Sequence, residues 1–542
     1  MDRSVRGTNK GGKMRKAIWV FGMVAVLVAC RAQAQANCSE PVTTASGVVR
    51  GVTEENGSCA WKGVPFAAAP VEELRWKAPQ PHPGWSGVRE ADQFGAMCMQ
   101  KGLAGLETKT SKAGMSEDCL YLNIWRPSKP GVYPVMYWVH GGGYTIGTAV
   151  TPMYWGDRLA AEGDVVVVTI NYRLNLFGFF ASPALREEDP NKSVGGYATL
   201  DQVEGLKWVS RNIHQFGGDP GNVTIFGESA GGWSICTLLA TPLAKGLFQR
   251  AILQSGGCTE SEDLDKGYEA GGKLAGAVGC KLDDLDCLRK VPAKKLLDKL
   301  ASGMGGAGNK PHHDGYVLTG TPLSMIRAGN YNRASFMAGS TRDEFGNALK
   351  LIGKYRRVRP KDYESALVKN FEFKDEDAKE LVSLYPLSEF DNRPVAAYGH
   401  AMGCDAALAC PTYQGLVAAA KQQKGNYYYR FDYDEMRLGK YMGSFHSAEI
   451  PFIFDTLDRL PYKIFYNHKN IGPARELSKT VQAYWLNFAK TGNPNAPGLA
   501  DWPEFSPGNQ VVQILDRETR TEKSTIPDRC EFWDTHEMER PH

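Results

Sequence analysis

The segment Gly227-Glu228-Ser229-Ala230-Gly231 limits what this chain can fold into more than any other part of the sequence. It follows the apolar run Val223–Gly227, which predicts a buried strand, and it precedes a stretch with the composition of an apolar helix. A serine with glycine two positions away on either side is typical of a sharp strand-to-helix turn, where larger side chains would collide. Such a turn exposes the Ser229 hydroxyl at a helix N-terminus, which favours developing negative charge. Ser229 is therefore predicted to be a nucleophile.

A second glycine turn, His140-Gly141-Gly142-Gly143, follows the apolar run Val135–His140. Without side chains, these residues can direct their backbone N–H groups into a pocket. The N–H groups of Gly142, Gly143 and Ala230 are predicted to form an oxyanion hole. Two such turns in this order, each after a strand, point to acyl transfer.

Six short apolar runs predict strands that are buried on both faces of a parallel sheet. A helical pattern at Thr199–Phe216, with a stop at the glycines of positions 217 and 218, is typical of the segments between them. Strands that alternate with helices predict an α/β fold with a large, mostly parallel central sheet and helices on both faces. Residues 260–400 are predicted to be helical insertions that cap the sheet. The runs are Val135–His140, Val165–Asn171, Val223–Gly227, Arg250–Gln254, Ser335–Ser340 and Tyr427–Tyr433.

Long stretches of the chain resemble the type-B carboxylesterase and lipase family of the α/β-hydrolases, which also contains the cholinesterases. The resemblance covers nearly all of residues 40–530 and implies the α/β-hydrolase fold and ester hydrolysis. The stretches that carry it are Glu117–Trp125 (EDCLYLNIW), His140–Tyr144 (HGGGY), Asn171–Phe179 (NYRLNLFGF), Thr199–Gly232, Ile252–Gly256 (ILQSG) and Tyr484–Pro503.

The remaining triad residues are expected in the order acid, then histidine, after Ser229. His446 stands in a Gly/Ser loop after the predicted strand Tyr427–Tyr433, and this segment is similar to the family's catalytic-histidine motif. Two adjacent carboxylates, Asp343 and Glu344, follow the strand Ser335–Ser340, and chemistry alone does not choose between them. The family pattern implies Glu344, with Asp343 as the alternative. The implied reaction is two-step acyl transfer through an acyl-enzyme, without a cofactor.

The first 36 residues have the pattern of an export signal. Basic residues end at Lys16, and the apolar run Ala17–Ala29 is too short to span a bilayer. Two processing sites compete: Ala34-Gln35-Ala36 is a small-x-small cleavage site, whereas Leu27-Val28-Ala29-Cys30 resembles a bacterial lipobox. We expect a signal peptide at residues 1–36 and one hydrolase domain at residues 37–542. The protein is then periplasmic or secreted, and membrane-bound only if Cys30 is lipidated.

Charge and cysteine content refine this picture. The net charge of +3 arises in residues 1–36, which hold seven basic residues and one acidic residue. The rest of the chain holds 56 basic and 59 acidic residues, so nucleic-acid binding has no support. Eleven cysteines follow Cys30, and an odd number leaves at least one unpaired. Local disulfides are plausible for Cys98 with Cys119 and for Cys280 with Cys287. No cysteine spacing suggests a metal site.

The substrate is the least determined feature. Tyr144, Trp233 and Phe345 adjoin the predicted catalytic motifs and are candidates for the pocket wall. His312 and His313 are predicted to accommodate a polar or anionic acyl group.

Residues 99–118 contain no aromatic side chain. The cholinesterases, which this chain resembles, have a cation-binding tryptophan in the corresponding segment. Choline esters are therefore not expected substrates. Two alternatives stay open: a non-catalytic binding or adhesion protein on the same fold, and an amidase or lactonase. The oligomeric state is not predicted.

Overall fold

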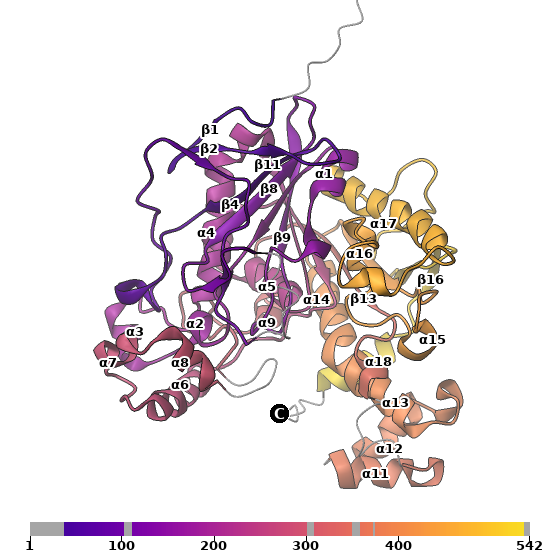
Figure 1. Cartoon of the computed structure of the whole chain (residues 1–542). Helices are drawn as coiled ribbons and strands as arrows, with labels where there is room; N and C mark the ends of the chain where they lie inside the picture. Colours follow the sequence, from indigo (N-terminus) through magenta and orange to yellow (C-terminus); the bar gives the residue numbers. More distant parts are fainter. Residues whose placement is uncertain (1–36, 102–110, 301–307, 350–357, 372–373, 536–542) are drawn as a thin grey trace, which may run out of the picture. The chain divides into compact units, whose positions relative to one another are not determined.

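An eleven-stranded sheet runs through the centre of the computed structural model, which describes residues 37–101, 111–300, 308–349, 358–371 and 374–535 (Figure 1). The proposed signal peptide and Cys30 lie outside these residues. The strand order is β16-β15-β14-β13-β12-β11-β9-β10-β8-β4-β3. The strands are β3 (Val52–Thr53), β4 (Cys59–Pro65), β8 (Tyr121–Arg126), β9 (Tyr133–Val139), β10 (Val166–Ile170), β11 (Gly218–Glu228), β12 (Arg250–Gln254), β13 (Ser335–Thr341), β14 (Asn426–Phe431), β15 (Val511–Leu515) and β16 (Arg520–Lys523).

The middle of the sheet is parallel and its edges are antiparallel. Strands β10, β9, β11, β12, β13, β14 and β15 pair in parallel, whereas β8, β4 and β3 on one side and β16 on the other pair antiparallel. The predicted mostly parallel sheet is confirmed. The small pieces outside it are β1 (Val42–Thr44), β2 (Gly47–Arg50), β5 (Val88–Glu90), β6 (Met97–Cys98) and β7 (Met115–Ser116).

Helices cover both faces of the sheet, because successive side chains of each strand point to opposite sides. On β9, Tyr137 packs into a core with α4 and α5, whereas Trp138 packs into a second core with α1 and α17 (Figure 1). The helices are α1 (Asp157–Gly163), α2 (Asn175–Phe179), α3 (Pro183–Glu188), α4 (Tyr197–Asn212), α5 (Ala230–Ala240), α6 (Leu264–Val278), α7 (Leu285–Lys290), α8 (Ala293–Asp298), α9 (Pro322–Arg327), α10 (Gly346–Leu349), α11 (Tyr363–Phe371), α12 (Asp375–Leu384), α13 (Pro394–His400), α14 (Cys410–Ala420), α15 (Gly439–Met442), α16 (Ile450–Ile453), α17 (Ile471–Thr491) and α18 (Pro527–Thr535).

The predicted insertions at residues 260–400 form two helical groups, one before β13 and one after it. Helices α6, α7 and α8 share a hydrophobic cluster with α3, and α11, α12 and α13 form another. Helix α13 continues into a π-helix at Ala401–Ala409. In the described part of the chain, none of the helices has both the length and the apolar character that crossing a bilayer requires.

Five disulfides join strands, helices and loops among the described residues. They include both of the local pairs expected from the sequence, and the described residues leave Cys404 as a buried free thiol, as the odd count requires. Each disulfide stabilises a fold by about 2–4 kcal/mol, mainly by restricting the unfolded chain. The pairs are Cys38–Cys59, Cys98–Cys119, Cys236–Cys258, Cys280–Cys287 and Cys410–Cys530.

The parallel register brings the carboxyl ends of five strands to one edge. Val139 of β9 pairs with Gly227 of β11, and Glu228 at the end of β11 pairs with Gln254 of β12. The register continues through β13 and β14, where Thr341 pairs with Phe431. The loops that follow these strands therefore meet beside Ser229, and they contain the other predicted site residues.

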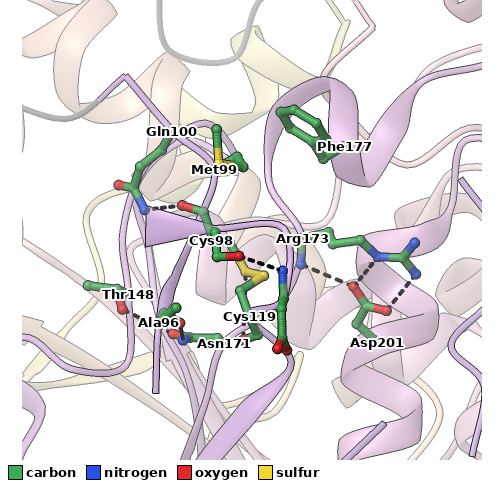
Figure 2. Close-up of a disulfide and its surroundings, with 12 residues drawn as sticks. Ala96, Cys98, Met99, Gln100, Cys119, Thr148, Asn171, Arg173, Phe177 and Asp201 are labelled. Atoms are coloured by element: carbon green, nitrogen blue, oxygen red, sulfur yellow. Dashed lines mark hydrogen bonds and ion pairs between the residues drawn. A yellow bond between two sulfur atoms is a disulfide. The ribbon is translucent and has the colours of Figure 1, made fainter. Parts of the chain in front are cut away.

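A buried ion pair joins the loop after β10 to α4. Arg173 donates to both carboxylate oxygens of Asp201, at 2.8 and 2.7 Å, and both side chains are almost inaccessible to water (Figure 2). Asp201→Ala would leave the guanidinium buried without its counter-charge, which costs about 3–5 kcal/mol. We therefore expect a lower midpoint of chemical unfolding for this variant. Asp298→Ala removes the exposed pair with Lys294 and should leave the midpoint unchanged; equal effects of the two substitutions would contradict this account.

Candidate active site

Ser229 sits at the turn between β11 and α5 in a backbone conformation that serine rarely adopts. Its φ is 58° and its ψ is −124°. A Cβ on Gly227 would lie 2.6 Å from the carbonyl oxygen of Gly231 and 2.7 Å from that of Val139, and a Cβ on Gly231 would overlap the Val139 carbonyl. The flanking positions therefore require glycine because the turn packs directly against the end of β9. This is the steric reason for the sequence pattern around Ser229.

The loop after β13 presents Glu344 to His446. Oε2 of Glu344 lies 2.5 Å from Nδ1 of His446, and the backbone N–H of His446 donates to the Glu344 carbonyl at 3.1 Å. Oε1 of Glu344 accepts bonds from the Ser255 hydroxyl at 2.6 Å and from the Thr341 N–H at 2.8 Å. Both carboxylate oxygens are thus used, which fixes the orientation of the imidazole.

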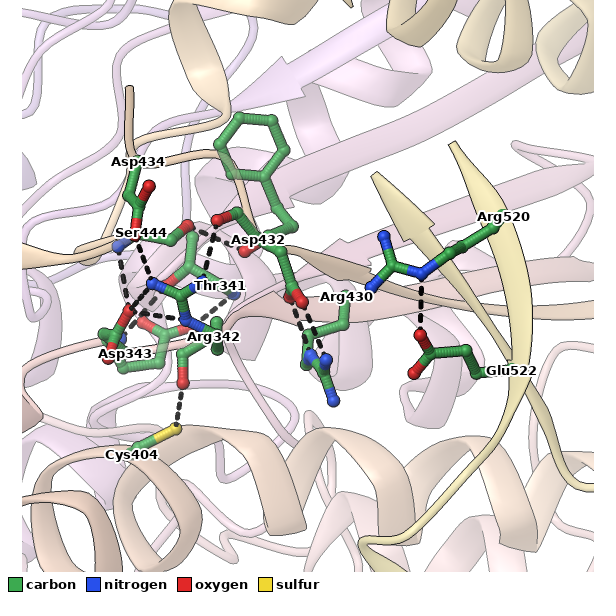
Figure 3. Close-up of polar contacts among 12 residues, drawn as sticks. Thr341, Arg342, Asp343, Cys404, Arg430, Asp432, Asp434, Ser444, Arg520 and Glu522 are labelled. Carbon is green, nitrogen blue, oxygen red and sulfur yellow. Dashed lines mark hydrogen bonds and ion pairs between the residues drawn. The ribbon is translucent and has the colours of Figure 1, made fainter. Parts of the chain in front are cut away.

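Asp343, the alternative acid, is committed to a different set of contacts (Figure 3). Its Oδ2 accepts bonds from Nε of Arg342 and from the N–H of Ser444, each at 2.9 Å. Arg342 also donates to Asp434 at 2.7 Å and to the carbonyl of Asp432 at 3.2 Å. Although burial opposes the charge, these carboxylates raise the pKa of Arg342. The network joins the loop of Glu344 to the loop of His446, so Asp343 holds the two loops together.

A second carboxylate lies on the other side of His446. Nε2 of His446 is 3.1 Å from Oε1 of Glu228, which also accepts a 2.5 Å hydrogen bond from Ser447. In the described part of the chain no hydrogen bond links Nε2 to Ser229. Burial disfavours the imidazolium, but Glu228 and Glu344 outweigh it and raise the pKa of His446 to about 9. In this arrangement the imidazole is charged at neutral pH.

A third buried carboxylate, Glu449, lies in the same cluster. Burial, together with the charges of Glu228 and Glu344, raises the pKa of Glu449 to about 8. Burial also raises the pKa of Glu228. Glu449 accepts a bond from Gln254, whose carbonyl accepts the N–H of Ser229. Glu449 is therefore protonated at neutral pH, because like charges this close in a dry site cannot all ionise.

The glycine turn after β9 packs against the serine. A Cβ on Gly141 would lie 2.9 Å from Cβ of Ser229. Gly142 and Gly143 have φ values of 115° and 58°, and the hydrogen bonds of the described residues include none donated by their backbone N–H groups. Ala230 is the first residue of α5, where backbone N–H groups have no partner within the helix. These free donors fit an oxyanion.

Of the predicted pocket residues, the three aromatic ones lie beside these motifs. Tyr144 is buried, with its ring centroid 5.5 Å from that of Trp233, and the Trp233 indole donates to the Gly256 carbonyl. The ring of Phe345 is 4.1 Å from that of His446. Trp233 and Phe345 are partly exposed, whereas Tyr144 is in the core.

The two predicted pocket histidines are engaged elsewhere. His312 is fully buried, with Nδ1 3.1 Å from the Gly195 carbonyl and Nε2 3.2 Å from Glu262. His313 lies 2.8 Å from the Ser261 hydroxyl and 3.0 Å from Asp263. The structure does not bring either residue to the triad among the contacts of the described residues. Their role with anionic acyl groups stays a prediction.

Sequence reasoning did not select three of the supporting groups: Ser255, Gln254 and Glu449. A signal for two of them exists, because Gln254 ends β12 at the same edge of the sheet as the serine turn, and Ser255 follows it directly. Glu449 follows His446 by three residues, but only the fold shows that both point inward.

One group of possible metal ligands occurs among the described residues, formed by His400, Cys404 and Asp405. Asp405 already accepts a 2.7 Å bond from the Tyr385 hydroxyl, and the Cys404 thiol lies 3.3 Å from the Arg342 carbonyl. Burial raises the pKa of the Cys404 thiol, which opposes the thiolate form that metal binding needs. These residues therefore do not form a convincing metal centre.

The sheet order, the serine turn and the loops that meet beside it define an α/β-hydrolase. A model of the carboxylesterase family matches residues 39–533. Para-nitrobenzyl esterase of Bacillus subtilis (strain 168) is 35% identical over 490 residues, which cover 89% of this chain and 96% of that protein. Fumonisin B1 esterase of Sphingopyxis macrogoltabida is 35% identical over 481 residues, which cover 86% of this chain and 85% of that protein.

A solved structure of PNB esterase agrees with these relatives. It superposes with a TM-score of 0.78 at 34% identity and covers 91% of this chain and 99% of that one. The chain belongs to the carboxylesterase family and is a carboxylic ester hydrolase. The predicted fold and enzyme class are confirmed.

The charge around His446 predicts an alkaline activity profile. A histidine that acts as a base must be neutral, so kcat/KM for an uncharged ester should rise with pH and reach half of its maximum near the pKa of His446, about 9. Glu228→Gln removes a negative charge that favours the imidazolium, so the midpoint should move to lower pH by roughly one unit or more. Initial rates of p-nitrophenyl acetate hydrolysis, corrected for spontaneous hydrolysis, measure both profiles.

Glu522 provides the matched control, because its side chain is 41% exposed on the edge strand β16, where Glu522→Gln makes the same chemical change away from His446. Its profile should superpose on that of the unaltered enzyme. An unchanged midpoint in Glu228→Gln would show that this carboxylate does not set the pKa of the base.

Proposed function

We propose that the protein hydrolyses carboxylic esters with a Ser229–His446–Glu344 triad through an acyl-enzyme. The observation that carries the proposal is the 2.5 Å contact between Glu344 and Nδ1 of His446, in loops that meet beside Ser229. The position of the serine at the turn between β11 and α5 and the family membership of the chain support it. In this mechanism His446 accepts the Ser229 proton as Oγ attacks the ester carbonyl, and Glu344 holds the imidazole and stabilises its charge.

The negative charge that develops on the substrate oxygen is accepted by the N–H groups of Gly142, Gly143 and Ala230. These donors need little reorganisation, because a glycine turn and a helix terminus hold them. His446 then gives its proton to the departing alcohol, and a water molecule repeats the attack on the acyl-enzyme. Each of these steps uses groups of the chain itself and water.

Glu228 sets the resting state in this proposal. Its contact with Nε2 of His446 keeps the imidazole charged and turned from Ser229 until a substrate is bound. Apo enzymes often form the serine–histidine bond only in the substrate complex. Entry of an apolar substrate beside Phe345 and Trp233 would exclude water and favour the neutral imidazole.

Small uncharged aryl and alkyl esters are the proposed substrates. The relatives include para-nitrobenzyl esterase, and the aromatic side chains of Trp233 and Phe345 offer an apolar wall. An amidase or lactonase specialisation uses the same groups and is the second candidate within the enzyme class. A non-catalytic binding protein is disfavoured, because the chain retains Ser229, Glu344 and His446.

Export of a single domain is the proposed cellular context. Residues 1–36 are proposed to be a signal peptide ahead of a hydrolase domain at residues 37–542, which enters the periplasm or the medium. Five disulfides support an oxidising compartment. Lipidation of Cys30 would add a membrane anchor, and mass spectrometry of the mature N-terminus distinguishes this from cleavage after Ala36.

Ser229→Ala tests the proposed nucleophile. Triad variants usually lose on the order of 10⁴- to 10⁶-fold in kcat, so we expect kcat for p-nitrophenyl acetate to fall by a factor of this size. A fluorophosphonate probe should label the unaltered enzyme once per chain and leave the variant unlabelled, as measured by intact-protein mass. Thermal unfolding should be almost unchanged, because only one oxygen atom is removed.

Ser447→Ala is the matched control, since it deletes a nearby serine hydroxyl that is not proposed to react. This variant should keep its ability to form the covalent adduct. A kcat of Ser229→Ala close to that of the unaltered enzyme would refute the site assignment. An unaltered enzyme that is inactive on aryl and alkyl esters but binds a ligand would favour the binding-protein alternative.

A further inference from the structure

The glycine turn that carries the proposed oxyanion donors is clamped from outside by the side chain of Gln100. Oε1 of Gln100 accepts the N–H of Gly147 at 2.9 Å, and its Nε2 donates to the Gly147 carbonyl, also at 2.9 Å. Gln100 is only 3% exposed. The Gln100 side-chain amide thus bonds to both the N–H and the carbonyl of Gly147, in the way that a residue of a neighbouring β-strand would.

Gly147 is the point at which the turn closes on itself. Within the turn, the N–H groups of Thr145 and Ile146 donate to the carbonyl of Gly142 at 3.1 and 3.0 Å. Gly147 has a φ of 109°, and a Cβ on it would lie 2.6 Å from Nδ1 of His140 and overlap the Gly141 carbonyl. A displacement of Gly147 therefore moves the first glycines of the turn, and with them the N–H groups of Gly142 and Gly143.

Gln100 is itself held by a covalently fixed segment (Figure 2). Its Nε2 also donates to the Cys98 carbonyl at 3.1 Å, and Cys98 forms a disulfide with Cys119. The Asn175 amide donates to the carbonyl of Met99 at 2.8 Å. Gln100 therefore links the position of Gly147 in the glycine turn to that of the disulfide-bonded segment at Cys98.

Another buried amide, Asn171, fixes the chain directly after Gly147. Its Oδ1 accepts bonds from the Thr148 hydroxyl at 3.0 Å and from the Ala149 N–H at 2.9 Å, and its Nδ2 donates to the Ala96 carbonyl at 3.0 Å. Asn171 thus secures residues beyond the turn, whereas Gln100 contacts the turn itself. Buried backbone groups outside a sheet need such partners, since leaving one unpaired costs about 1–3 kcal/mol.

We propose that Gln100 is a positioning residue for ester hydrolysis, which fixes Gly147 and thereby aims the N–H groups of Gly142 and Gly143 at the oxyanion. The inference rests on the proposed function, since these donors matter only where an oxyanion forms. According to this proposal, the segment Cys98–Gln100 affects the rate of the reaction, although Gln100 does not touch the substrate. Loss of this clamp should weaken binding of the transition state more than binding of the substrate.

Gln100→Leu tests the proposal with a pair of ligands. Oγ of Ser229 adds to the carbonyl carbon of an aryl trifluoromethyl ketone and gives its proton to His446, and the ketone oxygen becomes, in the resulting hemiketal, an oxyanion in the hole. The corresponding alcohol has no carbonyl and forms no such adduct. We expect the affinity for the ketone to fall about 10- to 100-fold, with a similar loss of kcat for p-nitrophenyl acetate. The affinity for the alcohol and the KM should stay within about twofold, because substrate binding does not depend on these donors.

Asn212→Leu is the matched control. Asn212 is also a buried amide that bridges backbone groups, accepting the Ala45 N–H at 2.8 Å and donating to the Trp208 carbonyl at 2.9 Å. It should lower thermal stability as Gln100→Leu does, without a selective loss of ketone affinity. Gln100→Glu is a second variant, nearly isosteric, that keeps the acceptor and replaces the donor, and we expect it to weaken ketone binding selectively as well.

The proposal is overturned if the folded Gln100 variants bind the ketone as tightly as the unaltered enzyme does. It is also overturned if ketone and alcohol lose affinity equally, or if Asn212→Leu produces the same selective loss. Failure of the proposed function is distinguishable, because the unaltered enzyme would then hydrolyse no ester and form no hemiketal.

Discussion

The close approach of the serine turn to the end of β9 is the constraint on which the site depends. Neither Gly227 nor Gly231 has room for a Cβ, since the carbonyl of Val139 occupies that space. This contact places Ser229 beside the glycine turn that follows β9. It also holds Ser229 at a φ of 58°, a conformation that the packed sheet must support. The proposed nucleophile and the proposed oxyanion donors are therefore brought together by one steric fit between neighbouring parallel strands.

Charge is the second organising feature. Three buried carboxyl groups, those of Glu228, Glu344 and Glu449, act on the imidazole of His446. Burial of several ionisable groups costs free energy, so such a cluster is not expected in a core that serves stability alone. Burial opposes the imidazolium, but the charges of Glu228 and Glu344 outweigh it and raise the pKa of His446 to about 9. Burial and the same two charges together raise the pKa of Glu449 to about 8. The Arg342 network, farther out, holds the two loops that carry Glu344 and His446 (Figure 3). The proposed base, His446, thus has its imidazole oriented by Glu344 at Nδ1 and held near the charge of Glu228 at Nε2.

Much of the fold and part of the site could be predicted from residue patterns. All six predicted strands exist: β12 has the predicted bounds, and the other five differ by one to five residues at their ends. The helix predicted at Thr199–Phe216 appears as α4 followed by a short 3-10 turn at Ile213–Phe216. The choice between Asp343 and Glu344 was beyond local pattern, since adjacent carboxylates differ only in where the loop directs them. The hydrogen bonds of His312 and His313 could not be predicted from local patterns either, because their partners Gly195 and Ser261 lie elsewhere in the sequence.

The sequence by itself determined the class of chemistry. A serine between two obligatory glycines and a second glycine turn restrict the backbone locally, and short-range sterics are legible in a sequence. Tertiary structure alone decided which carboxylate reaches His446, that Glu228 lies at its other nitrogen, and that Gln100 braces the glycine turn. Each of these contacts joins residues that are distant along the chain or compete with neighbours of the same type. Their formation depends on sheet register and loop packing, which no local pattern encodes.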